Sequence, residues 1–217
     1  MFENLRQYKI VLASKSPRRK QLLGEILGPS LPFEIRTLEG IDESFPEGLS
    51  HEETALHIAD KKREAFLPTL GAGELLITAD TIVCIDGRVL GKPSDEVEAM
   101  DMLRLLSGKT HDVVTAVTLT VAPNATTEPD STLASLSPYG DQGVRGTSFA
   151  VTTHVTFATL TDDQIRYYVE LFEPLDKAGA YGIQEWIGTV AITSIEGSYQ
   201  NVVGLPTQKL YQKLAEI

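Results

Sequence analysis

The sequence is poor in cysteine and in positive charge, and both shortages exclude classes of protein. Its one cysteine, Cys84, cannot form a disulfide within the chain, and the apolar run TIVCI around it predicts a small buried hydrophobic side chain. The 19 Lys and Arg residues are outnumbered by 30 Asp and Glu residues, so the formal net charge is −11. Because like charges slow the encounter with a polyanion, we expect neither nucleic-acid binding nor binding to an anionic membrane. A reducing compartment, by default the cytoplasm, is the expected location.

Long hydrophobic runs are also missing. No run approaches the roughly 20 residues that a membrane-spanning helix needs. The N-terminal stretch MFENLRQYK has mixed charges where a secretory signal would have an apolar core. With 217 residues, 42% hydrophobic and 23% charged, the chain can bury a proper core, and we expect one α/β domain over residues 1–217.

What the sequence does contain is a basic segment at a strand-to-helix junction, KIVLASKSPRRKQLL at residues 9–23. Its residues 10–13 are a short apolar run that is typical of a buried strand. Ser16 and Pro17 then supply an N-cap hydroxyl and a proline for the first helical position, and the helix is expected to reach about Leu27.

The first turn of that helix is unusually positive. It contains Arg18, Arg19 and Lys20, at the end where the helix macrodipole is already positive. A phosphate held by the Ser14 and Ser16 hydroxyls, the helix N-terminus and an arginine would offset this charge. A solvated basic helix start is the simpler alternative for this motif taken alone.

Hydrophobic periodicity predicts the remaining elements. Strands are predicted at residues 33–38, 75–79, 82–85, 89–90, 111–121, 148–158 and 189–195. Helices are predicted after the caps Ser50, Ser94 and Thr161, with ends near Phe66, Leu106 and Phe172, and a terminal helix ends near Ala215. Residues 122–147 are rich in Ser, Thr, Pro, Gly and Asp and predict a surface loop insertion, with a lid over a site as the alternative.

Asp80 is the most conspicuous acid in the sequence. With Thr81 it interrupts an apolar stretch, where a carboxylate is costly unless it is paired, hydrogen-bonded or bound to a metal. Lys92 lies on the turn GKP near the end of the same sheet, whereas Lys62 lies late in a helix, where it could simply complement the dipole. The four histidines lack the spacing of a zinc site.

Six segments in order resemble the Maf family of nucleoside triphosphate pyrophosphatases over nearly the whole chain. They are LASKSPRR at 12–19, ADTIV at 79–83, GKP at 91–93, LSGKTHDVVTAV at 106–117, LDKAGAYGIQ at 175–184 and GSYQNVVGLP at 197–206. The resemblance implies hydrolysis of a nucleoside triphosphate to the monophosphate and pyrophosphate with a divalent metal, Mg²⁺ or Mn²⁺. It implies a fold like that of the inosine triphosphate pyrophosphatases, with two α/β lobes around a central mixed sheet and the site in the cleft between them. A homodimer is a possible assembly.

The resemblance also assigns roles to residues. The positions that match the phosphate, metal and catalytic positions of the family are Ser14, Arg18, Arg19, Glu43, Lys62, Asp80 and Lys92. Asp80 matches the proposed proton acceptor, and Glu43 and Asp80 are expected to hold the metal. Arg18, Thr81 and Gln184 match the positions that choose the base.

The DKAGAYGIQ segment looks like the subgroup that acts on dTTP and UTP, in contrast to the one that acts on 7-methyl-GTP. The Gln184 amide could pair with the O4 and N3–H edge of a pyrimidine. This chain departs from the family pattern at Ala116, at Glu185-Trp186 and in the length of the 122–147 insertion. We interpret Trp186 as a packing residue in preference to a base-stacking one.

Two alternatives stay open at this stage. A nucleotide-binding regulator of septum formation would use the same pocket without turnover, although intact acids and lysines argue against a dead site. A house-cleaning enzyme for damaged pyrimidine nucleotides would need the same phosphate site and a similar base edge, so the sequence does not separate it from dTTP and UTP hydrolysis.

Overall fold

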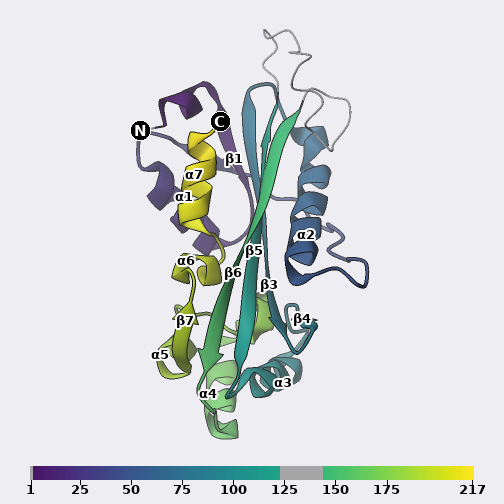
Figure 1. Ribbon diagram of the computed structural model, residues 1–217, viewed down its shortest axis with the longest axis vertical. Coiled ribbons are helices and arrows are strands. Elements are labelled where there is room, and N and C mark those ends of the chain that lie inside the picture. The colour runs from purple at the N-terminus through teal and green to yellow at the C-terminus, as the bar shows by residue number, and fades with distance from the viewer. Residues whose placement is uncertain (1, 123–143) are drawn as a thin grey trace.

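The computed structural model describes residues 2–122 and 144–217, and within them one mixed sheet runs through the molecule (Figure 1). The strand order is β2-β1-β3-β5-β6-β7, and β4 pairs with β3. The strands are β1 (Lys9–Ala13), β2 (Phe33–Ile35), β3 (Glu74–Ile85), β4 (Arg88–Leu90), β5 (Thr110–Val121), β6 (Arg145–Phe157) and β7 (Ile192–Glu196). The prediction of a mixed α/β sheet with flanking helices is confirmed.

Helices cover both faces of this sheet (Figure 1). They are α1 (Pro17–Leu27), α2 (His51–Phe66), α3 (Glu96–Leu106), α4 (Asp162–Phe172), α5 (Trp186–Val190), α6 (Tyr199–Val203) and α7 (Thr207–Ala215). Ala55 and Ile58 of α2 pack on Ile82 and Val114 on one face, while a larger apolar cluster joins the opposite face to α1, α3, α4 and α7. None of these helices, within the described ranges, is long and apolar enough to cross a bilayer.

Strand β3 positions the site because its pairing changes along one edge. It runs parallel to β1, with Ala13 opposite Thr78 at the end of that ladder, and its pairing with β4 begins only at Val83. Residues 79–82 therefore lie at a gap in this edge of β3. Since side chains alternate along a strand, Asp80 faces α2 and Thr81 faces α1 and α6.

The predicted helix starts are largely confirmed. The Ser16 hydroxyl accepts a hydrogen bond from the backbone N–H of Arg19, and Ser50 and Thr161 form complete capping boxes. At α3 the predicted cap was wrong by one residue, because Asp95 accepts from the backbone N–H of Glu98 while Ser94 donates to the Glu98 carboxylate.

Four predictions of where strands begin or end were wrong. Residues 75–85 form one continuous strand, since Asp80 and Thr81 keep their ladder partners on β5. The last strand begins at Ile192, because residues 189–190 close helix α5. Strand β6 begins at Arg145, so residues 145–147 of the predicted insertion are strand, and residues 123–143 lie outside the described part of the chain. Strand β2 ends at Ile35, short of the predicted Leu38.

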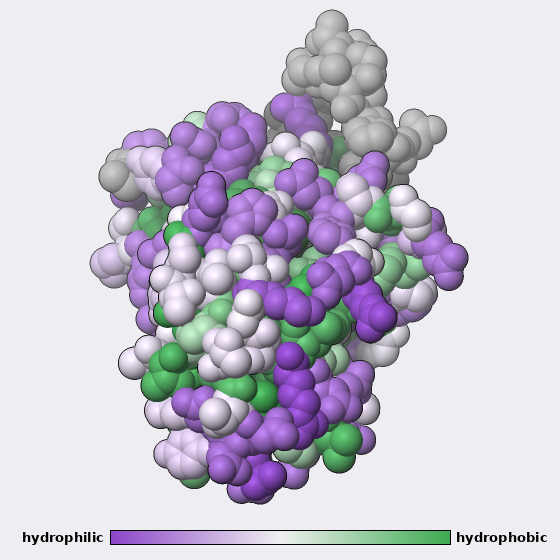
Figure 2. Space-filling model, turned by 60° about the horizontal axis from the view of Figure 1, so that its bottom comes forward, coloured by the Kyte–Doolittle hydropathy of each residue, from purple (hydrophilic) through white to green (hydrophobic). Residues whose placement is uncertain are grey.

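The lower end of the molecule has no broad apolar face in the view of Figure 2. Apolar side chains there form small separate patches among polar ones. Val97 of α3 and Tyr167 and Leu171 of α4 are among the exposed apolar residues of the described chain. Scattered exposure of this kind is ordinary for a protein surface.

Candidate active site

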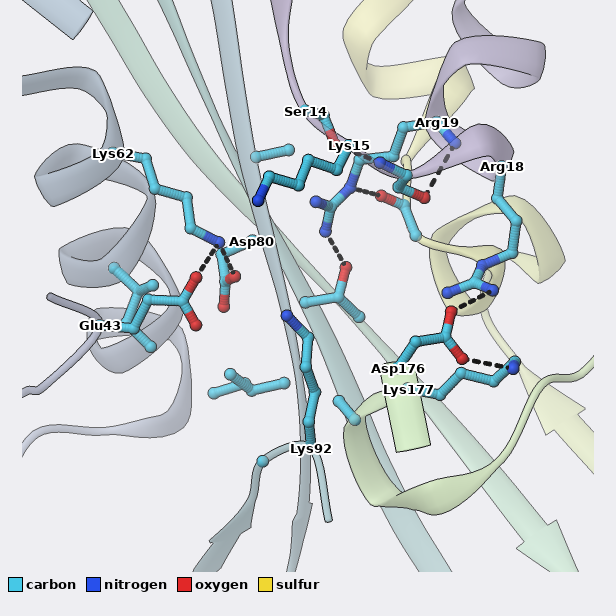
Figure 3. A pocket seen from close by; sticks show the side chains of 18 of the residues that line it. Ser14, Lys15, Arg18, Arg19, Glu43, Lys62, Asp80, Lys92, Asp176 and Lys177 are labelled. Atoms are coloured by element: carbon cyan, nitrogen blue, oxygen red, sulfur yellow. Dashed lines mark hydrogen bonds and ion pairs between the residues drawn. The ribbon is translucent and has the colours of Figure 1, made fainter. Parts of the chain in front are cut away.

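A cavity of about 690 Å³ opens at the gap in the β3 edge (Figure 3). All nine residues that the family resemblance selected line it, namely Ser14, Arg18, Arg19, Glu43, Lys62, Asp80, Thr81, Lys92 and Gln184. They come from the β1–α1 junction, the loop after β2, α2, β3, the turn after β4 and the segment before α5. The fold thus brings separate sequence motifs to one place.

On the α2 side of the cavity, one ammonium holds two carboxylates. Lys62 Nζ lies 2.5 Å from Asp80 Oδ1 and 2.9 Å from Glu43 Oε1. Partial burial by itself would raise the pKa of Glu43, but the hydrogen bond and charge of Lys62, helped by Lys92 and Arg19, lower it below its usual range. Lys62 is therefore part of the cavity, whereas its neighbour Lys61 pairs with Asp42 at 2.8 Å.

On the opposite side, Arg19 is fixed by the protein itself. Its Nε donates to the Gly204 carbonyl and its Nη2 to Thr81 Oγ1, both at 2.8 Å. Burial lowers the pKa of Arg19, although Asp80 and Glu43 oppose this shift. Within the described residues Arg19 Nη1 makes no hydrogen bond, so this nitrogen of the guanidinium is available to bind an anion.

The serines at the start of α1 are oriented as well. The Ser14 oxygen accepts from the backbone N–H of Ser16 at 3.2 Å, and the Ser16 oxygen accepts from the backbone N–H of Arg19 at 3.3 Å. Each hydroxyl keeps its proton for donation, so the junction offers O–H donors together with the helix N-terminus. This is a suitable arrangement for phosphate oxygens.

The glycine-rich segment before α5 supplies a chain of charges that the sequence analysis did not select. Asp176 lies 3.6 Å from Arg18 and 2.6 Å from Lys177, and Lys177 lies 3.1 Å from Glu185. Burial alone would raise the pKa of Asp176, but the hydrogen bond and charge of Lys177, and then the charge of Arg18, lower it. Asp176 and Lys177 both belong to the motif LDKAGAYG. This segment is irregular, so it has no hydrophobic periodicity from which the direction of either side chain could be predicted.

Tyr168 lies behind this side of the site, outside the cavity lining. The Tyr168 hydroxyl donates to Glu185 and accepts from the backbone N–H of Gly182 at 3.0 Å. Gln184, one residue before Glu185, is exposed at the cavity rim. Trp186 is outside the lining and packs its ring on Tyr167 with centroids 5.0 Å apart, which confirms its packing role.

The cavity is positive in an acidic protein. Among the described residues, six Lys and Arg side chains and four Asp and Glu side chains line it, although the chain has a net charge of −11. Figure 3 shows Lys15 and Lys92 pointing toward its centre from opposite sides. Lys15, which pairs with Glu39, was also missed, although it stands between the two selected serines. The local charge favours a compact polyanion as ligand.

Glu43 and Asp80 are suited to Mg²⁺ or Mn²⁺. Within residues 2–122 and 144–217, no group of three or more His, Cys, Asp or Glu side chains is arranged to hold a metal ion. Two carboxylates are sufficient for Mg²⁺, which keeps several waters and takes further oxygens from substrate phosphates. The donor set therefore fits a metal that is shared with a phosphorylated substrate.

The chain is similar to known proteins over nearly its whole length. The family model described as Maf-like protein matches residues 9–217. A protein of Phocaeicola vulgatus named dTTP/UTP pyrophosphatase is 48% identical over 100% of both chains, and one of Bacteroides thetaiotaomicron with the same name is 45% identical over 100% of both. A solved HAM1 protein from Coxiella burnetii covers 97% of this chain and 100% of its own, with 16% identity and a TM-score of 0.45. Because the Maf-like family model matches residues 9–217 and the named relatives are similar over their full length, this protein belongs to the Maf family.

Proposed function

We propose that the protein is a nucleoside triphosphate pyrophosphatase that hydrolyses dTTP and UTP to the monophosphate and pyrophosphate, with Mg²⁺ or Mn²⁺ as cofactor. The observation behind the proposal is the cavity itself, where cations from several segments surround a carboxylate at the gap in β3. The substrates follow the names of relatives that are 40% to 48% identical over at least 98% of each chain.

The phosphate chain is bound by exchange of partners. In the free protein Arg18 is paired with Asp176. Lys62 is paired with Asp80 and Glu43. A triphosphate with about four negative charges competes with these carboxylates for the two cations. Arg19 and Lys92 add two further cations, and Ser14 donates its hydroxyl. These groups hold the phosphates in line before reaction, so positioning and charge neutralisation account for most of the acceleration.

Glu43 and Asp80 would hold the divalent metal together with substrate oxygens. When bound, the metal supplies charge neutralisation on the phosphates and polarises oxygen ligands. Lys62 keeps both carboxylates on the same side of the cavity in the free protein.

Asp80 acts as the general base. In the free protein Lys62 holds Oδ1, which orients the carboxylate and leaves Oδ2 open to a water molecule before the triphosphate binds Lys62. Asp80 takes a proton from that water as its oxygen forms a bond to the α-phosphorus, and the bond from this phosphorus to the bridging α–β oxygen breaks. Pyrophosphate leaves with the bridging oxygen, and Arg19 and Lys92 neutralise its charge.

Gln184 selects the base from the rim. Its amide offers one donor and one acceptor, which match the O4 and N3–H edge of thymine and uracil. CTP presents the opposite pattern at these two atoms, so a Gln184 amide that the bound substrate holds in one orientation would discriminate against CTP. Damaged pyrimidines that keep this edge would enter the same site.

The test is pyrophosphate release from dTTP, UTP, CTP, GTP, ATP and 7-methyl-GTP, with Mg²⁺ and with Mn²⁺. We expect turnover of dTTP and UTP, and a loss of at least ~10²-fold in kcat for Asp80→Asn. The matched control is Asp42→Asn, which removes a carboxylate that pairs with Lys61 outside the cavity. Binding of dTTP with no turnover in the wild type would favour the septum regulator over the enzyme.

A further inference from the structure

Three of the six sequence motifs meet at the Arg19 guanidinium, and a fourth joins them through Thr81. Arg19 belongs to α1, and it donates to Thr81 of β3 and to the Gly204 carbonyl after α6. Behind Thr81, Thr115 of β5 lies 3.0 Å from Thr81 Oγ1 and 3.0 Å from the Asn201 carbonyl oxygen. Thr115 is fully buried and lies outside the cavity lining, so the proposed reaction gives it no direct role.

The direction of these hydrogen bonds follows from a count of protons. A carbonyl oxygen has no proton to donate, so the Thr115 hydroxyl donates its only proton to Asn201. The contact between the two threonines is therefore made by the Thr81 proton, which Thr115 accepts. That leaves the Thr81 oxygen as an acceptor toward Arg19 Nη2. The chain runs in one direction, from Arg19 through Thr81 and Thr115 to Asn201.

The end of this chain is firmly anchored. Asn201 is fully buried, and its Nδ2 donates to the Val113 carbonyl and to Thr153 Oγ1, each at 3.0 Å. These bonds fix α6 against β5 and β6. Because Gly204 follows α6 directly, both acceptors of Arg19 depend on the same anchored segment.

We propose that Thr115 is a positioning residue that keeps Arg19 in the geometry for a substrate phosphate. The proposal rests on the proposed function, in which Arg19 binds the triphosphate. With Thr115 in place, the Thr81 proton is engaged and its oxygen stays turned toward Arg19, so the guanidinium is ordered before substrate arrives. Such prior ordering improves binding because less freedom is lost when the complex forms.

The first test compares three variants by kinetics. Thr115→Val keeps the shape but removes the hydroxyl, and we expect kcat/KM to fall about tenfold, mainly through KM, while Thr115→Ser restores it. The matched control is Thr118→Val on the same strand, since Thr118 is equally buried but bonds to Asp60 and Ser148 on the other face. The proposal is wrong if both valine variants change kcat/KM alike.

The second test asks whether Thr115 acts through Arg19. The Kd of inorganic triphosphate, measured by calorimetry without divalent metal, should rise about tenfold in Thr115→Val. In an Arg19→Lys background the same substitution should change Kd less than twofold, because the guanidinium that donates to Thr81 is absent. An equal change in both backgrounds would overturn the proposal. This readout needs no turnover, so absence of nucleotide hydrolysis would defeat the proposed function alone.

Discussion

At the scale of single residues, Asp80 shows how a costly group is retained in a strand. Its carboxylate lies in an otherwise apolar stretch, and a carboxylate buried without a partner would be strongly unfavourable. Lys62 supplies the partner and joins Asp80 to Glu43. The same arrangement prepares a base, a metal position and a phosphate-binding cation.

Replacing Lys62 should therefore harm activity far more than replacing its neighbour. We expect Lys62→Met to lower kcat/KM by ~10²-fold, the range for losing one positioned charge-stabilising group. Lys61→Met is the matched control, because Lys61 makes an exposed pair with Asp42 that is worth little. Steady-state kinetics on dTTP checks both, and equal losses would contradict the separate role of Lys62.

A buried histidine sets a pH dependence of stability. Burial lowers the pKa of His111 to about 4 from 6.5, and its Nε2 lies 2.8 Å from the Tyr181 hydroxyl. Because the unfolded chain binds this proton first, the free energy of unfolding should decrease as the pH falls from 6.5 to about 4, by on the order of 3 kcal/mol.

Urea unfolding at a series of pH values checks this. His111→Gln should have a flatter profile between pH 4 and 6.5 than the wild type. His57→Gln serves as control, since His57 lies on α2 away from the His111, Phe157 and Tyr181 rings. Parallel profiles for His111→Gln and the wild type would show that another group is responsible.

Some of the residues of the site can be predicted from the sequence and others cannot, and the difference has physical reasons. Asp80 was found because an acid in an apolar run is costly, and the resemblance supplied positions such as Glu43 and Gln184, which have no local signal. Thr115 was missed because a threonine is an ordinary strand former, and its hydrogen-bond partners come from residues far away in sequence.

At the scale of elements, the gap in the β3 edge matters more than any one helix. Strand β1 ends beside Thr78 and β4 ends beside Val83, so ligands can approach β3 between these two points. Local patterns predicted the described strands and the longer helices α1, α2, α3, α4 and α7, since caps and periodicity are local, but they missed the short helices α5 and α6. They did not predict that 75–85 is one strand, because the ladder with β5 comes from distant residues.

The short helix α5 makes Gly188 critical. A Cβ on Gly188 would lie 1.9 Å from the Ile183 carbonyl oxygen, so the segment before Gln184 would have to move. We expect Gly188→Ala to lower the free energy of unfolding by ~1–3 kcal/mol and to reduce the preference for UTP over CTP several-fold.

The control for this prediction is Thr161→Ala. It removes a capping box of α4 and should cost ~1 kcal/mol without changing the preference between bases. Thermal unfolding and the ratio of kcat/KM values for UTP and CTP measure the two effects. An unchanged ratio in Gly188→Ala would show that this segment does not hold Gln184.

At the scale of the whole molecule, charge is divided between surface and site. The chain is acidic overall, yet its cavity is lined by more cations than carboxylates among the described residues. This local excess of cations favours a small polyanion as the ligand of the cavity.

Ligand binding should consequently stabilise the fold. With dTTP at about 100 times its Kd, we expect the inactive Asp80→Asn variant to gain ~2.7 kcal/mol in the free energy of unfolding. Thermal unfolding with and without dTTP measures this gain, and thymidine, which lacks the phosphates, should give much less. Equal shifts with both ligands would mean that the phosphate-binding cations contribute nothing.

The central claim is that water attacks the α-phosphorus, and isotope labelling tests it most directly. Hydrolysis of dTTP in H₂¹⁸O should place one ¹⁸O in dTMP and leave pyrophosphate unlabelled, as measured by mass spectrometry. Label in pyrophosphate, or release of orthophosphate with dTDP, would contradict the account.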